Sequence, residues 1–239
     1  GLGYYTRCKN LLATARYISW ELKGKFPATY KEILSLKGVG PYTAAAIASF
    51  AYQLPHAVVD GNVFRVLSRY FGISTPIDST DGKKLYSLLA NEVLDKDNPG
   101  SHNQAIMDFG AVICKPQQPL CGECPQRKDC QAFQNNWIQR LPVKEKQLIR
   151  TKRWLYYFII EAKGEILVRR RAEKDIWENL FEFVLQESSG NTGTDEETLQ
   201  AILQQLSGKG SFTIGKISGI RKQQLTHQTI EGLFVHVFV

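Results

Sequence analysis

The feature that most constrains this chain is a cluster of cysteines: four of the five lie in the pattern Cys114-x6-Cys121-x2-Cys124-x5-Cys130. Four thiolates within a loop of 17 residues can surround one metal centre, and ligation by cysteine alone suits zinc or an iron–sulfur cluster. Disulfide pairing is the alternative, but nothing in the sequence marks a secreted protein. Zinc sites more often contain two Cys-x2-Cys pairs, whereas only Cys121 and Cys124 form one here, so the spacing favours a cluster. Cys8 stands far away, and we interpret it as an ordinary helix residue.

Length and charge narrow the class of protein. The 239 residues are enough for two ordinary domains, and 43% hydrophobic with 22% charged residues is typical of a folded globular chain. A formal net charge of +7 favours an anionic partner such as nucleic acid, although alone it is a weak signal. The sequence contains no apolar run of about 18 residues, so we expect no membrane partner.

The pattern of apolar residues changes along the chain and predicts two domains. Residues 1–134 have helical spacing, residues 135–153 form a basic connector with little periodicity, and residues 154–239 have the character of strands. In the second part, Trp154-to-Glu161 and Glu165-to-Arg169 flank Lys163-Gly164 and predict a hairpin. A helix is predicted over Glu196-to-Leu206 and a strand over Gly232-to-Val239.

The segment from Leu36 to Ala44 places Gly38 and Gly40 just before Pro41, a residue that suits the first turn of a helix. Glycine lets the backbone approach a ligand closely, and the amides at a helix start attract an anion such as a DNA phosphate. A tight turn between helices without a ligand is the alternative. Further along, Asp60 begins another amphipathic helix, where taken alone it is explained more simply as a helix cap than as a catalyst.

Taken together and in order, four segments resemble the helix-hairpin-helix DNA glycosylases of the endonuclease III superfamily. They are the hairpin, the segment Val58-to-Val66, the segment Asn103-to-Gly110 and the four cysteines, and they span roughly residues 1–134. Within this superfamily, the opening Gly1-to-Tyr5 segment and the strand-rich second part resemble the MutY-type adenine glycosylases. The resemblance implies an α+β protein: an all-helical glycosylase domain with an iron–sulfur loop holding a [4Fe–4S] cofactor, followed by a Nudix-like α/β domain.

The resemblance also implies a reaction. Endonuclease III enzymes carry lysine two positions after the second hairpin glycine, where its amine forms a Schiff base that leads to strand cleavage. This chain has Tyr42 there, and a phenol cannot form an imine, so the family pattern implies a monofunctional enzyme. Its substrate would be adenine opposite 8-oxoguanine or guanine in double-stranded DNA, flipped out of the helix and released by hydrolysis of the N-glycosidic bond. Asp60 matches the aspartate that stabilises the sugar cation, Asn62 matches the nearby amide, and Tyr42 would assist around the sugar.

The general-acid glutamate of the family lies upstream of the segment Gly1-to-Tyr5. Those first residues resemble the middle of a helical region, and the last predicted strand stops abruptly, so we expect a piece of a longer protein that is inactive alone. We also expect a monomer in the bacterial cytoplasm, associated with DNA.

Further residues are assigned to recognition by the same resemblance. The DNA-contacting residues are expected to be Tyr4, Lys37, Gly38, Val39, Gly40 and Arg65. In the second domain no GX5EX7REUXEEXGU box is present, so pyrophosphate hydrolysis is not expected. By this resemblance, Thr226 and His227 occupy the place of the family's residues that recognise 8-oxoguanine. Their hydroxyl and imidazole groups can hydrogen-bond a purine edge. A plain turn before the last strand is the alternative.

Two other functions stay open at this point. The first is an endonuclease III-like pyrimidine glycosylase with lyase activity, which Tyr42 and the strand-rich second domain oppose. The second is a non-catalytic iron–sulfur module that binds DNA.

Overall fold

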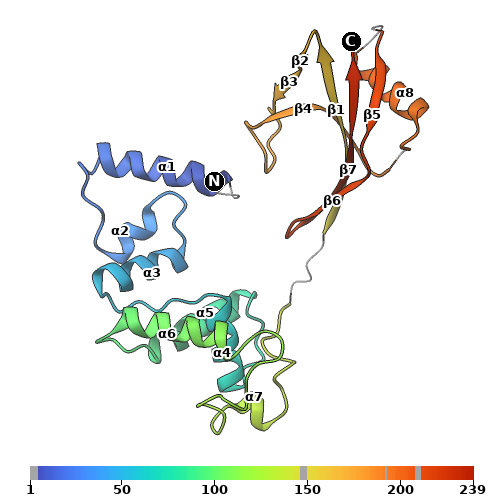
Figure 1. Cartoon of the computed structure of the whole chain (residues 1–239). Helices are drawn as coiled ribbons and strands as arrows, with labels where there is room; N and C mark the ends of the chain where they lie inside the picture. The colour runs from blue at the N-terminus through green and yellow to red at the C-terminus, as the bar shows by residue number, and fades with distance from the viewer. Residues whose placement is uncertain (1–4, 146–149, 192, 208–210) are drawn as a thin grey trace. The chain divides into compact units, whose positions relative to one another are not determined.

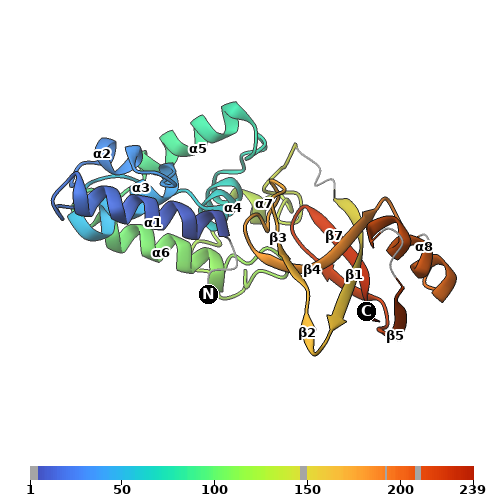
Figure 2. The same cartoon turned by 90° about the horizontal axis from the view of Figure 1, so that it is seen from above.

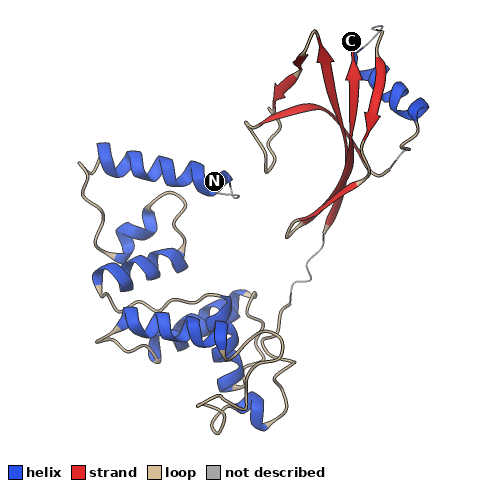
Figure 3. Ribbon diagram, in the orientation of Figure 1, coloured by secondary structure: helices blue, strands red, loops and turns tan. Residues whose placement is uncertain are grey.

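The chain divides into two units, residues 1–147 and 148–239. The computed structural model describes residues 5–145, 150–191, 193–207 and 211–239. The boundary between the units falls inside the predicted connector. Figure 3 shows the described part of the first unit as helices and loops, and that of the second unit as a sheet with one helix.

Helices make up the regular structure of the first unit (Figure 1). They are α1 (Tyr5–Trp20), α2 (Tyr30–Ser35), α3 (Pro41–Tyr52), α4 (Gly61–Phe71), α5 (Thr80–Glu92), α6 (Pro99–Val112) and α7 (Gln131–Gln134). Their starts follow from local sequence: Thr29, Asp60 and Ser79 accept hydrogen bonds from backbone amides at the beginnings of α2, α4 and α5. Proline occupies the first turn of α3 and of α6, where its fixed φ angle suits a helix and its missing N–H is not needed.

Two small cores organise these helices. Ile33 of α2 packs against Ala44 and Ala48 of α3. Val63 and Leu67 of α4 form a second core with other residues, Tyr86 of α5 among them. Helix α6 contacts both α3 and α4, an arrangement that can be followed in Figure 1 and Figure 2. The start of α4 is therefore positioned relative to α3 by a helix that comes later in the chain.

The second unit contains a mixed sheet with α8 (Glu196–Ser207) on one face. The strands are β1 (Thr151–Ala162), β2 (Glu165–Ile166), β3 (Val168–Arg170), β4 (Phe181–Ser188), β5 (Thr213–Ile217), β6 (Arg221–Gln224) and β7 (Gln228–Phe238). The order is β3-β4-β1-β7-β5, with β2 paired to β1 and β6 paired to β7. The central pair, β1 and β7, is parallel and the other pairs are antiparallel.

Alternation along β1 explains why the sheet has two distinct faces. Tyr156 and Phe158 are fully buried and pack with Leu199 and Leu203 of α8, whereas Leu155, the residue before Tyr156, packs on the opposite face. Residues that point to one face of a strand recur at every second position.

The predicted helix and the first and last predicted strands of this unit are present, with ends shifted by a few residues. The strand predicted over Glu165-to-Arg169 is divided into β2, which pairs with β1, and β3, which pairs with β4. The predicted hairpin turn is also correct, because Lys163 and Gly164 have φ angles of 53° and 80°, as a two-residue turn between antiparallel strands requires. The connector, by contrast, is partly structured. Leu141 is only 5% exposed, its carbonyl accepts a hydrogen bond from Arg69 Nε at 3.0 Å, and Thr151 already belongs to β1.

Candidate functional site

The hairpin between α2 and α3 presents its backbone to solvent. Gly38 has a φ of 81°, and a Cβ atom there would lie 2.5 Å from Asn10 Cβ, so only glycine fits this position. A Cβ on Gly40 would meet nothing within 4 Å, which leaves open space beside the first turn of α3. Lys37, Gly38 and Gly40 are exposed and Val39 is half-buried. The hairpin residues predicted to bind DNA are thus accessible, with the open space at a helix start that an anion site needs.

Tyr42 lies in the first turn of α3, directly after this hairpin. Its side chain is 46% exposed, so the ring is not a packed core aromatic. The exposure leaves the phenol available to a ligand that reaches the start of α3.

Asp60 forms the N-cap of α4. Its Oδ1 accepts hydrogen bonds from the backbone N–H groups of Asn62 and Val63, both at 2.8 Å. Its Oδ2 accepts one from the Asn62 side-chain amide at 3.0 Å. The cap predicted for this residue is therefore present, and Asn62 holds both carboxylate oxygens in one orientation.

The structure contradicts the prediction that Arg65 contacts DNA. Its side chain is 7% exposed, and its guanidinium donates to Gly110 O and Cys114 O, both at 2.7 Å. It also donates to Asn62 Oδ1 at 2.8 Å. Burial lowers the pKa of Arg65, while the neighbouring Cys114 and Asp60 act in the opposite direction. The residue therefore joins the start of α4 to the end of α6 inside the unit, and its donors are not presented to a ligand.

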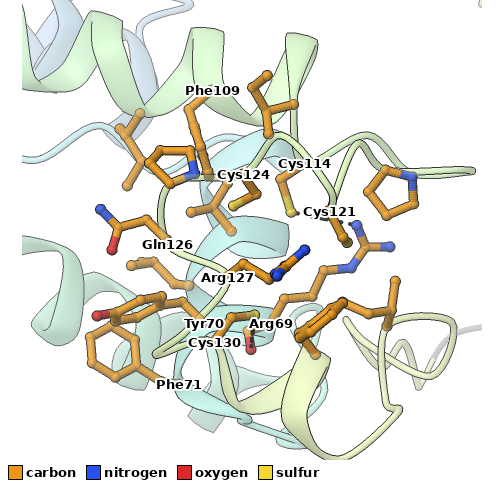
Figure 4. Close-up of a pocket in the computed structure, with 18 of the residues that line it drawn as sticks. Arg69, Tyr70, Phe71, Phe109, Cys114, Cys121, Cys124, Gln126, Arg127 and Cys130 are labelled. Carbon is orange, nitrogen blue, oxygen red and sulfur yellow. Dashed lines mark hydrogen bonds between the residues drawn. The ribbon is translucent and has the colours of Figure 1, made fainter.

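The four clustered cysteines line one cavity of about 440 Å³. Figure 4 shows their side chains around it, Cys130 coming from the start of α7 and the other three from the end of α6 and the loop after it. Burial raises the pKa of Cys121 and of Cys124, and the other thiols nearby raise it further. The four thiols thus line the same cavity, and their role as metal ligands stays a prediction.

Among the described residues, no group of three or more His, Cys, Asp or Glu side chains is arranged to hold a metal ion. As a donor set, four thiols suit either zinc or an iron–sulfur cluster.

Sequence reasoning missed Arg69, which connects α4 to the cysteine loop. Its guanidinium donates to Lys115 O at 2.7 Å and to Cys114 Sγ at 3.5 Å, while Cys130 Sγ donates to Arg69 O at 3.4 Å. It also missed Asn103, which is 1% exposed on α6. A signal for Arg69 was present: two arginines four residues apart lie beside the apolar positions of one short helix, where cations are rarely buried without partners.

In the second unit, the residues predicted to read 8-oxoguanine lie at an exposed turn. The Leu225 N–H donates to Gln228 O at 2.8 Å, so Thr226 and His227 form the tip of the hairpin that joins β6 to β7. Both are exposed, and His227 O accepts a hydrogen bond from Thr151 N at 3.0 Å. Thr226 and His227 thus lie in a turn before the last strand, and their side chains are accessible. Tyr4, predicted to contact DNA, lies outside the described residues.

Comparison with known proteins places these features in context. The model of the family described as "Helix-hairpin-helix motif" matches residues 21–50. The adenine DNA glycosylase of Buchnera aphidicola subsp. Schizaphis graminum is 36% identical over 184 residues, which cover 77% of this chain and 53% of that protein. The adenine DNA glycosylase of Homo sapiens is 43% identical over 150 residues, 62% of this chain and 26% of that protein.

A solved structure described as a thermostable thymine-DNA glycosylase matches with a TM-score of 0.50 at 35% identity, covering 53% of this chain and 58% of that one. The predicted resemblance to helix-hairpin-helix DNA glycosylases is therefore confirmed, and about half of the chain has a fold similar to that of this solved glycosylase. The second unit contains a mixed sheet. The chain spans about half the length of the bacterial relatives that it matches. None of the described helices is long and apolar enough to cross a bilayer.

Proposed function

We propose that this chain is part of an adenine DNA glycosylase, a base excision repair enzyme that removes adenine mispaired with 8-oxoguanine or guanine. The observation that carries the proposal is the junction of α3 and α4: an accessible glycine hairpin, an exposed Tyr42 and an oriented Asp60 carboxylate, in a chain similar to adenine DNA glycosylases. The hairpin amides would bind a DNA phosphate and fix the register of the duplex.

Asp60 is the residue that we assign to the chemistry. Departure of adenine leaves positive charge on the sugar, and a carboxylate held close to that charge stabilises the transition state. The two backbone N–H groups and the Asn62 amide that hold Asp60 fix its direction without a cation. Asn62 thus orients the carboxylate, and Tyr42 would contact the sugar or its phosphate. Because a phenol cannot form an imine, base removal leaves the strand intact.

Binding measurements test this assignment without requiring turnover. A duplex carrying a cationic azasugar opposite 8-oxoguanine mimics the charged sugar, and a neutral tetrahydrofuran site is its control. We expect the protein to prefer the cationic duplex and Asp60→Asn to lose that preference. Equal affinity of the wild-type protein for the two duplexes would refute the role of Asp60.

The rival function, an endonuclease III-like glycosylase with lyase activity, makes a different prediction. It requires an amine that attacks the sugar, so borohydride would trap a covalent protein–DNA complex on damaged duplex. We expect no trapped complex with this protein, and a trapped band would favour the rival.

We further propose that Cys114, Cys121, Cys124 and Cys130 hold a [4Fe–4S] cluster. The donor set fits, because four thiols line one cavity and thiolate is the ligand that such clusters require. The cluster would supply a rigid anchor for the loop from Cys114 to Cys130. Iron and sulfide analysis of anaerobically purified protein should give about four of each per chain, and one zinc per chain would argue for the other metal.

The second unit is proposed to be a Nudix-like domain that reads the base opposite adenine. The exposed tip at Thr226 and His227 offers a hydroxyl and an imidazole to a purine edge. A cavity of about 430 Å³ lies on the sheet face opposite α8, and Tyr157, Trp177 and Phe234 are among its lining residues. Aromatic side chains of this kind are suited to contact with planar groups.

A further inference from the structure

A second asparagine, Asn103, is buried between α6 and the segment that leads to Asp60. Its side chain is 1% exposed, and its amide uses both ends. Oδ1 accepts a hydrogen bond from Val58 N at 3.0 Å, while Nδ2 donates to His56 O and to Ser49 Oγ, each at 2.9 Å. One side chain of α6 therefore joins α3 to the backbone two residues before Asp60.

The segment between α3 and α4 begins at Gln53, which ends α3 with a φ of 53°, and runs to Asp60 without helix or strand. Its side chains pack on both cores of the unit, and two of its backbone N–H groups are held by asparagine side chains. The Ala57 N–H is held by Asn91 Oδ1 of α5 at 3.2 Å, in an exposed position, and the next N–H, that of Val58, is held by Asn103. Val58 is itself buried, so water cannot readily replace the Asn103 amide there.

Helix α6 contacts both neighbours closely on either side of Asn103. A Cβ on Gly100 would lie 3.1 Å from Ser49 O of α3, and one on Gly110 would lie 2.7 Å from Asn62 Cβ of α4. These close approaches fix the distance between the start of α4 and α3. Asn103 lies between these two glycines on α6, and its amide holds the segment that connects α3 to α4.

We propose that Asn103 is a positioning residue for Asp60: its amide fixes the 56–58 segment against α3 and α6, and thereby sets where the carboxylate stands relative to the hairpin. The inference rests on the proposed role of Asp60. Asn103 does not touch the substrate. It acts through the backbone, and a displacement of the carboxylate by about 1 Å is enough to weaken its interaction with a developing charge severely.

The test uses the ratio of affinities of the full chain for two duplexes, one with a cationic azasugar and one with the neutral tetrahydrofuran site. Asp60→Asn gives the ratio without the carboxylate. We expect Asn103→Ala to lower the ratio about tenfold or more towards that value, while affinity for the neutral duplex changes less than about twofold, since the hairpin is untouched. Asn91→Ala is the matched control, because it removes the neighbouring amide-to-backbone bond at an exposed position, and should leave the ratio unchanged.

A second variant covers the case in which Asn103→Ala fails to fold. Ser49→Ala removes the α3 anchor of Asn103 but keeps its bonds to His56 and Val58, and should lower the ratio about threefold. Amide hydrogen exchange in the same variant should become faster at Val58 and at Val63 than in the wild-type protein.

The outcomes separate the two ideas. The role of Asn103 is overturned if a folded Asn103→Ala protein has the wild-type ratio of duplex affinities. It is also overturned if Ser49→Ala changes neither that ratio nor the amide hydrogen exchange. Neither result would affect the proposed role of Asp60. If Asp60→Asn itself has the wild-type ratio, the proposed function of Asp60 fails and this inference fails with it.

Discussion

Replacement of Arg65 by lysine tests whether this residue stabilises the first unit or binds DNA. The side chain makes three short hydrogen bonds, to Gly110 O, Cys114 O and Asn62 Oδ1, at 2.7, 2.7 and 2.8 Å. Lysine keeps the charge but has a compact ammonium that cannot reproduce a planar fork of donors. We expect it to retain one of the three bonds.

The expected loss of unfolding free energy in Arg65→Lys follows from the two hydrogen bonds that lysine does not make. A hydrogen bond to a charged group contributes about 1.5–3 kcal/mol, so two of them correspond to about 3–6 kcal/mol. Because Arg65 is only 7% exposed, water cannot take over the freed carbonyls. For a unit of this size, each kcal/mol shifts the melting temperature by about 2–4 °C, and we expect Arg65→Lys to melt about 10 °C lower.

Circular dichroism at a helical wavelength reports mainly on the first unit, since the second has one described helix. Arg16→Lys, an exposed position on α1, is the control and should melt within about 1 °C of the wild-type protein. A direct DNA contact would give the opposite pattern: unchanged melting with weaker duplex binding and a shallower salt dependence. That pattern would refute the assignment of Arg65 to the interior.

Three further predictions concern other parts of the chain. Gly38→Ala should weaken duplex binding and lower the free energy of unfolding. Gly24→Ala has a similar φ of 79° but open space around it, so it should lose only about 1–2 kcal/mol of stability to backbone strain. Equal losses of unfolding free energy in urea would contradict the clash at Gly38. Burial lowers the pKa of His56 from its ordinary value of 6.5, so its contribution to stability is present above that value and is lost as the pH falls through the folded-state pKa. Melting temperatures measured between about pH 7 and 5 should therefore fall less steeply for His56→Gln, and parallel curves would contradict this. Thr226→Ala combined with His227→Ala should reduce the preference for duplexes with 8-oxoguanine over those with guanine, measured by competition, and an unchanged preference would reject the reader role.

Spacing and turn chemistry in the sequence were enough to locate the cysteine cavity and the hairpin. Cys121 and Cys124 are close in sequence, and the loop that carries all four thiols is short, so few folds could keep them apart. Gly38 is required by a positive φ angle that other residues rarely adopt. The cysteine loop and the hairpin each depend on residues that are close in sequence, so their local patterns are enough to predict them.

Contacts between distant residues could not be predicted in the same way. Arg65 and Cys114 are 49 positions apart, and Asn103 and Val58 are 45 apart. From the sequence alone, Arg65 lies about one turn after Asp60 and is most simply interpreted as a contact to an anionic ligand. The carbonyl groups that bind it instead belong to Gly110 and Cys114, at the end of α6 and in the loop after it, and their approach is not visible in the local sequence. Likewise, Leu141 carries no periodic signal, and the arginine that holds its carbonyl, Arg69, lies 72 positions earlier in the chain.

The cap and the catalytic interpretation of Asp60 are compatible, and the structure gives a physical reason. A cap uses the carboxylate as an acceptor of neutral N–H groups, which orients it but leaves its negative charge in place. Among the residues that the structure describes, Asp60 forms no salt bridge. The nearest guanidinium, that of Arg65, donates to Asn62 Oδ1 instead. Asn62 therefore separates a buried cation from the carboxylate while holding both, so the charge of Asp60 stays available to a cationic sugar. A direct Arg65–Asp60 pair would have given a stable cap and neutralised the group that the reaction needs.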